Sequence, residues 1–164
     1  MHRTRKQLVL DGFIAGLLGY AAVALLFAFV NLASMRGIFA TPEALGRAIL
    51  GTTDRAAGPG GAMAPILAFN GLHLLASLVL GMLVAFLAEQ AESDHGLAYG
   101  LVFTAIAVGG FVPIFVGAIT VEALHALSWK SAVAGSVAGG LATLGYIAWL
   151  HRDLVHQLFQ EIEA

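Results

Sequence analysis

The sequence contains no cysteine, which excludes disulfide bonds, thiolate metal sites and thiol-based catalysis. Charged side chains are also scarce: they make up 11% of the 164 residues, whereas soluble domains carry about 25%. The formal net charge is −2, so no basic excess indicates a nucleic-acid partner. What remains is a chain in which hydrophobic residues occupy 59% of the positions.

Four long stretches contain no Asp, Glu, Lys or Arg: residues 12–35, 58–88, 96–121 and 131–150. Each reaches the length of about 20 residues that a helix needs to cross about 30 Å of hydrocarbon. The sequence therefore predicts an all-α fold, an integral membrane four-helix bundle in which residues 1–164 form a single domain. The expected spans are residues 10–35, 62–89, 96–121 and 130–150.

Basic residues indicate how the chain is oriented in the membrane. Arg3, Arg5 and Lys6 directly precede the first span, and basic residues are retained on the cytoplasmic side. We therefore expect the amino terminus, and after four crossings the carboxyl terminus, to be cytoplasmic. The remaining basic residues do not reinforce this orientation, because the count over the whole chain is a tie: Arg36, Arg47, Arg55 and Lys130 would lie outside, and Arg3, Arg5, Lys6 and Arg152 inside.

Two segments outside the spans have the pattern of short amphipathic helices. Residues 42–50 follow Thr41, an expected N-cap, with Pro42 at the first helical position and Gly51 at the end. Residues 152–162 repeat apolar side chains at helical spacing. We expect both to lie at the membrane surface as interfacial helices. The second is also compatible with a docking helix for a partner.

Small residues indicate how the spans pack, because helices in lipid associate through close backbone contact. In the fourth span, Gly135 and Gly139 form a small-xxx-small motif, so they are the predicted helix-packing residues. The same face continues through Ser131 and Thr143. The other spans have comparable stripes, which include Gly12, Gly16, Ala15, Gly19, Ser77, Gly81 and Ala85.

His73 lies near the middle of the second span, in a polar or small stripe with Asn70, Ser77 and Gly81. Ionisable residues are costly inside a membrane and usually face a bundle interior or a cavity. The third span contains Gly109-Gly110-Phe111-Val112-Pro113 at a similar expected depth, where the proline removes a backbone donor and frees a carbonyl.

Three interpretations of this region stay open. A neutral His73 hydrogen-bonds the freed carbonyl and locks a helix kink, or His73 faces lipid. In the third, the region is a ligand-binding, proton or metal site built from His73, Asn70, Gly109, Gly110 and Pro113.

Glu122 and His125 lie three residues apart at the outer end of the third span, a spacing found in carboxylate-bridged di-metal bundles. No other span offers an inward carboxylate, so a solvated helix end is favoured over a metal site at Glu122 and His125. A haem held by two histidines is rejected because no second histidine shares the expected depth of His73. We expect no cofactor, and no acid–base pair or nucleophilic set indicates an enzyme.

The loop segment Thr41-Pro42-Glu43-Ala44-Leu45-Gly46-Arg47-Ala48-Ile49-Leu50 is similar to a TPxxLGxxL segment of small uncharacterised bacterial four-span membrane proteins. The resemblance extends to His73, to Ser128-Trp129 and to His151-Arg152, and it covers roughly residues 10–155. It implies a protein of the bacterial cytoplasmic (inner) membrane. No activity follows from it, so no functional residue is transferred.

The expected function is that of a non-enzymatic integral membrane protein, an accessory or structural subunit that packs against other membrane helices. Its expected partners are the lipid bilayer and either membrane-protein subunits or further copies of the chain, with no nucleic acid. One alternative is a small transporter or ligand-binding membrane protein centred on His73. A third is a metal or redox subunit that uses Glu122 and His125.

Overall fold

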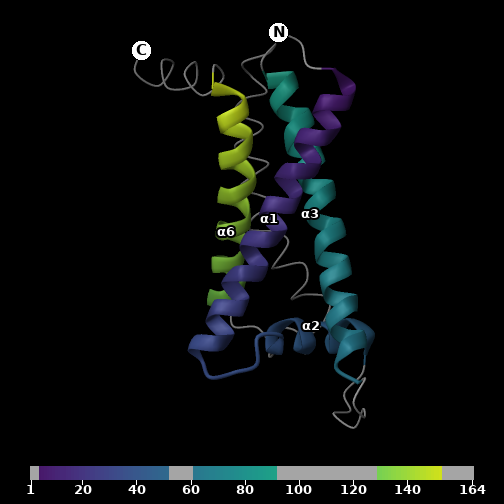
Figure 1. Cartoon of the computed structure of the whole chain (residues 1–164), viewed down its shortest axis with the longest axis vertical. Helices are drawn as coiled ribbons and strands as arrows, with labels where there is room; N and C mark the ends of the chain where they lie inside the picture. Colours follow the sequence, from purple (N-terminus) through teal and green to yellow (C-terminus); the bar gives the residue numbers. More distant parts are fainter. Residues whose placement is uncertain (1–3, 52–60, 92–128, 153–164) are drawn as a thin grey trace.

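The computed structural model describes residues 4–51, 61–91 and 129–152, which form helices and no strands (Figure 1). The helices are α1 (Arg5–Ala33), α2 (Ala40–Leu50), α3 (Met63–Ala91) and α6 (Trp129–Leu150). The predicted all-α class is confirmed for this part of the chain. The predicted span at residues 96–121 and nearly all of the predicted surface helix at 152–162 lie outside the described residues.

Helices α1, α3 and α6 are long and apolar enough to cross a membrane. They contain 29, 29 and 22 residues, so at about 1.5 Å per residue each exceeds the ~30 Å thickness of a hydrocarbon core. Their outward faces carry large apolar side chains, such as Leu25, Leu75 and Leu141, which are 71%, 60% and 67% exposed. Helices of this length with exposed apolar faces have the form of membrane spans.

Helix α1 begins at Arg5, earlier than the predicted span, because Thr4 caps it. The Thr4 hydroxyl accepts a hydrogen bond from the Gln7 amide at 3.4 Å, and the Gln7 side-chain oxygen accepts one from the Thr4 amide at 3.0 Å. This reciprocal capping box satisfies two donors at the start of the helix. Helices α3 and α6 have bounds close to those of the predicted spans, which were 62–89 and 130–150.

Helix α1 lies between α3 and α6 and packs against both (Figure 1). Glycines bring its backbone into contact with α3. A Cβ atom added at Gly12 would lie 2.6 Å from Cα of Met82, and one added at Gly81 would lie 2.6 Å from Cα of Gly16. Side chains at these positions would force the helices apart, so the glycines set the distance between α1 and α3.

The contact between α1 and α6 uses the glycine motif predicted from the sequence. A Cβ atom at Gly139 would lie 2.8 Å from Cγ2 of Val23, and one at Gly135 would lie 3.2 Å from the Phe27 ring. One turn beyond Gly139, the Thr143 hydroxyl donates a hydrogen bond to the Ala15 carbonyl at 3.3 Å. The structure thus places both predicted packing glycines against α1.

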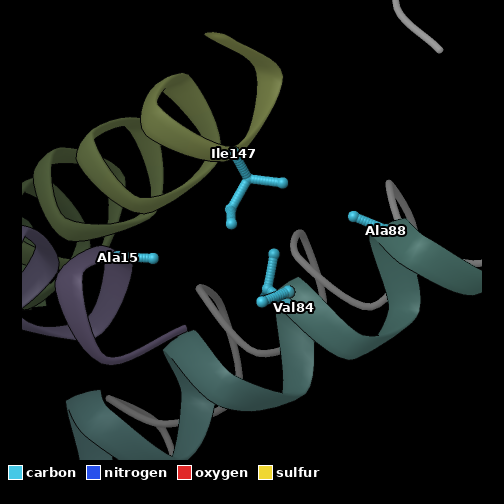
Figure 2. Packing of buried hydrophobic residues seen from close by; sticks show 5 residues of the cluster. Ala15, Val84, Ala88 and Ile147 are labelled. Carbon is cyan, nitrogen blue, oxygen red and sulfur yellow. The ribbon is translucent and has the colours of Figure 1, made fainter. Parts of the chain in front are cut away.

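Buried apolar side chains from the three spans form one cluster. In it, Ala15 of α1, Val84 and Ala88 of α3, and Ile147 of α6 point towards one another (Figure 2). Ala15 and Ala88 are fully buried, and Ile147 is 2% exposed. Alanines on two of the helices leave room for the larger isoleucine of the third.

Helix α2 runs across one end of the bundle and packs against α3 (Figure 1). Leu45 and Gly46 are its buried residues, and a Cβ atom at Gly46 would overlap the carbonyl group of Pro65. The helix ends at Gly51, whose φ of 64° is the left-handed conformation that glycine adopts without strain. Gly51 therefore stops α2 as predicted.

The start of α2 differs from the prediction, and the assignment of Thr41 as an N-cap is wrong. The helix begins at Ala40, and the cap residue Phe39 makes no side-chain cap bond. Thr41 instead donates a hydrogen bond to the Asn31 side chain at 2.9 Å. Pro42 is therefore the third helical residue, which is tolerated because amides in the first turn have no partner within the helix.

Candidate functional site

Helices α1 and α3 carry larger, polar side chains on the α2 side of their glycine contact. Tyr20 follows Gly16 by four residues and lies on the same face of α1. Its hydroxyl donates a hydrogen bond to Oδ1 of Asn70 at 3.0 Å. Asn70 in turn donates through Nδ2 to the Ile66 carbonyl at 2.8 Å. Both ends of the Asn70 amide are therefore bonded within the protein.

His73 lies one turn from Asn70 on α3, with its ring between two aromatic neighbours. The ring centroids are 5.2 Å apart for Tyr20 and His73 and 5.6 Å apart for Phe69 and His73, with tilted planes. These distances are typical of attractive aromatic pairs. Among the described residues, no hydrogen bond is formed by the imidazole nitrogens. The ring is thus held by packing.

A small cavity of about 50 Å³ lies beside His73. It is lined by residues of α1, of the α1–α2 connection, of α2 and of α3: Ala24, Phe27, Ala28, Ile38, Phe39, Pro42, Phe69, Asn70 and His73. This volume exceeds the ~10–15 Å³ that a single water needs, but it is far below the ~300 Å³ of the smallest ligand pockets. The cavity fits water and not an organic substrate.

Asn31 fixes the segment that closes this cavity. Its side chain is 2% exposed, donates to the Ile38 carbonyl at 3.0 Å and accepts a hydrogen bond from Thr41 at 2.9 Å. Both polar atoms of the buried amide therefore have partners, as buried polar groups require. Because Phe39 lies between the two bonded residues, the same bonds hold it beside the cavity.

The depth of His73 differs slightly from the prediction. It is ten residues from the start of α3, or about 15 Å, whereas Ser77 is the midpoint of the 29-residue helix. The imidazole is thus on the α2 side of the midpoint by about 6 Å. The glycine contact, and not the polar group, occupies the centre of the α1–α3 interface.

The other predicted site residues lie outside the described part of the chain. They are Gly109, Gly110, Pro113, Glu122 and His125. A pairing of His73 with the proline break, and a metal site at the outer end of the third span, therefore stay predictions. Within the described residues, no group of three or more His, Asp or Glu side chains is placed to hold a metal.

Two residues that shape the site, Tyr20 and Asn31, were not predicted from the sequence. Tyr20 had a usable signal, because the spacing Gly12–Gly16–Tyr20 puts it on the glycine face of α1. The signal for Asn31 was weaker. It is a single amide side chain at the end of an apolar stretch, and such a residue can equally well be solvated. Its burial depends on the path of the α1–α2 connection, which no local pattern specifies.

The arrangement holds a half-buried imidazole against a water-sized cavity, next to an amide and a hydroxyl that are already bonded to each other. A neutral imidazole has one donor and one acceptor nitrogen, so His73 can bind water in the cavity. Comparison with known proteins adds nothing to this geometry: no family model, no curated protein and no solved structure matches the chain.

Proposed function

We propose that the chain is a non-enzymatic accessory or structural subunit of the bacterial cytoplasmic membrane, with cytoplasmic termini, which packs against other membrane helices. The supporting observation is that polar side chains within the bundle bond helices to one another. Among the described helices, α1 is bonded in this way to the three others: Tyr20 to Asn70 of α3, Asn31 to Thr41 of α2, and the Ala15 carbonyl to Thr143 of α6.

The size of the cavity beside His73 favours this function over transport of an organic substrate. A pocket for a small molecule has a volume of about 300–1,000 Å³, whereas this cavity has about 50 Å³. Partner chains would have access to the broad apolar faces of the spans, where Leu25 of α1 and Leu75 of α3 are 71% and 60% exposed. These faces meet lipid or other helices.

The test is to extract the tagged full-length chain, expressed at its native level, from its host membrane into lipid nanodiscs and to identify the proteins that co-purify with it. We expect a second membrane chain, or a further copy, at a fixed ratio. Leu25→Trp and Leu75→Trp add bulk on two different exposed faces, and we expect one of them to remove the companion while thermal unfolding is unchanged. A chain that is alone in both the wild type and the variants would contradict the proposal.

A second candidate function, passage or binding of protons or water at His73, is favoured by one observation. Its imidazole lines the cavity and is held by ring contacts, without a hydrogen bond to any described residue. In proteoliposomes with an internal pH dye, His73→Ala would then abolish proton flux while the protein remains folded. Ser77→Ala, one turn away on α3, is the matched control and should conduct as the wild type does. If His73→Ala lowers stability alone, its role is structural.

A further inference from the structure

An open groove with a volume of about 560 Å³ runs along α6 beside α1. Its walls are apolar apart from one lysine, and they comprise Leu26 of α1 and Lys130, Val133, Ala134, Val137, Ala138 and Leu141 of α6. The groove lies on an exposed side of α6, where Val133, Val137 and Leu141 are 49%, 54% and 67% exposed.

The spacing of the lining residues places those of α6 in two rows along the helix. Lys130, Ala134 and Ala138 follow one another at intervals of four and make one row along α6. The bulkier Val133, Val137 and Leu141 make the neighbouring row. Because alanine side chains are short, the alanine row forms the floor of a furrow that the bulkier row and Leu26 flank.

The length of the groove matches one leaflet of a bilayer. Lys130 and Leu141 are eleven residues apart, or about 16 Å along the helix axis. Half of a hydrocarbon core is about 15 Å. A lipid acyl chain extends over one leaflet, which is the length of this groove.

Lys130 supplies a positive charge at the polar end of the groove. It lies in the first turn of α6, is exposed, and that turn contains no acidic residue. A cation next to the positive end of the helix dipole is unfavourable unless an anion is nearby. No ion pair from Lys130 is formed within the described part of the chain. An anionic group at this position would be attracted by both the ammonium and the helix terminus.

We propose that this groove binds one acyl chain of an anionic phospholipid, with the lipid phosphate beside Lys130. The apolar furrow accounts for the acyl chain, the one-leaflet length for a lipid, and the lysine for the negative headgroup. The site is separate from the cavity beside His73 and does not depend on the proposed accessory function. It would make α6 sensitive to the lipid composition of the membrane.

The test uses the absence of cysteine from the chain. Val137→Cys puts a single thiol in the groove, and its maleimide labelling rate in detergent is measured while phosphatidylglycerol or phosphatidylcholine with identical acyl chains is added. We expect phosphatidylglycerol to protect the thiol at about one fifth of the phosphatidylcholine concentration, because one basic residue contributes about 1 kcal/mol of attraction to anionic lipid. Leu75→Cys, on an exposed face of α3, should show no such difference.

Two further changes in the Val137→Cys background separate headgroup from acyl-chain recognition. Lys130→Gln should make the two lipids equally protective, whereas Arg36→Gln, another exposed cation outside the groove, should leave the fivefold difference intact. Ala138→Phe should weaken protection by both lipids, while Ala76→Phe on the exposed face of α3 should not. Equal protection by both lipids with Lys130 present would overturn the proposal, as would a cysteine that cross-links to another protein chain and is shielded from lipid.

Discussion

The Tyr20 hydroxyl and the Asn70 amide oxygen lie 3.0 Å apart and join α1 to α3 on the α2 side of their closest approach. The helices touch backbone to backbone at Gly16 and Gly81, and one turn further along α1 a tyrosine needs room. The small residues therefore fix the distance between the helices, and the tyrosine–asparagine bond fixes their rotation about that contact.

Removal of this hydrogen bond should weaken the bundle measurably. In Tyr20→Phe the Asn70 oxygen loses its donor, and we expect the free energy of unfolding to fall by about 0.6 kcal/mol, the average for hydrogen bonds between membrane helices, and by no more than the observed maximum of about 1.7 kcal/mol. Unfolding in mixed detergent micelles, followed by circular dichroism, provides the measurement. A double-mutant cycle with Asn70→Leu isolates the pair, and a coupling energy near zero would show that the bond contributes nothing.

The glycine contact between α1 and α3 predicts opposite effects for two glycines of the same helix. Gly81→Ala would drive a methyl group into the backbone of α1 at Gly16, so we expect a loss of stability of about 1–3 kcal/mol from overpacking. At Gly71 no atom of the other described residues lies within 4 Å of the added methyl, apart from the backbone of its own helix. Gly71→Ala should therefore be neutral or stabilise the helix by up to about 1 kcal/mol. Equal effects of the two changes, measured as shifts of the unfolding midpoint, would contradict this account.

The sequence predicted the features that depend on composition and spacing along one helix. The extent of the charge-free stretches predicted bounds close to those of α3 and α6. The regular spacing of small residues indicated Gly135 and Gly139 as packing positions, and both lie against α1. Such patterns are local, because a helix repeats its faces every three to four residues whatever its neighbours are.

The parts that the sequence did not predict depend on which residues meet across the bundle. Thr41 is a residue type that is common at N-caps. It instead donates a hydrogen bond to Asn31, because the connection between α1 and α2 folds back on the end of α1. Tyr20 meets Asn70 because the antiparallel register of α1 and α3 puts them at one depth. A residue's own type does not encode that register, which is why a hydrogen-bonded pair is harder to predict than a span.

The buried amide of Asn31 should hold the closing segment of the cavity in place. Asn31→Ala removes the donor to Ile38 and the acceptor for Thr41, and buried polar groups left without partners cost about 1–3 kcal/mol. We expect faster hydrogen exchange at residues 38–41, with exchange in α6 unchanged. The comparison is Asn31→Asp, which keeps the acceptor for Thr41. If both variants exchange as the wild type does, the segment is held by packing alone.

Neighbouring glycines of α6 provide the sharpest test of how it packs on α1. A side chain at Gly139 would meet Val23, whereas at Gly140 no atom of the described residues lies within 4 Å of an added Cβ. Gly139→Leu should therefore separate α6 from α1, break the bond from Thr143 to Ala15 and lower the unfolding midpoint by several degrees. Gly140→Leu is the same substitution at the next residue and changes helix propensity by the same amount. It should leave the unfolding midpoint unchanged or raise it. Thermal unfolding in one detergent decides between them, because loss of stability in both variants would place the contact of α6 on a different face.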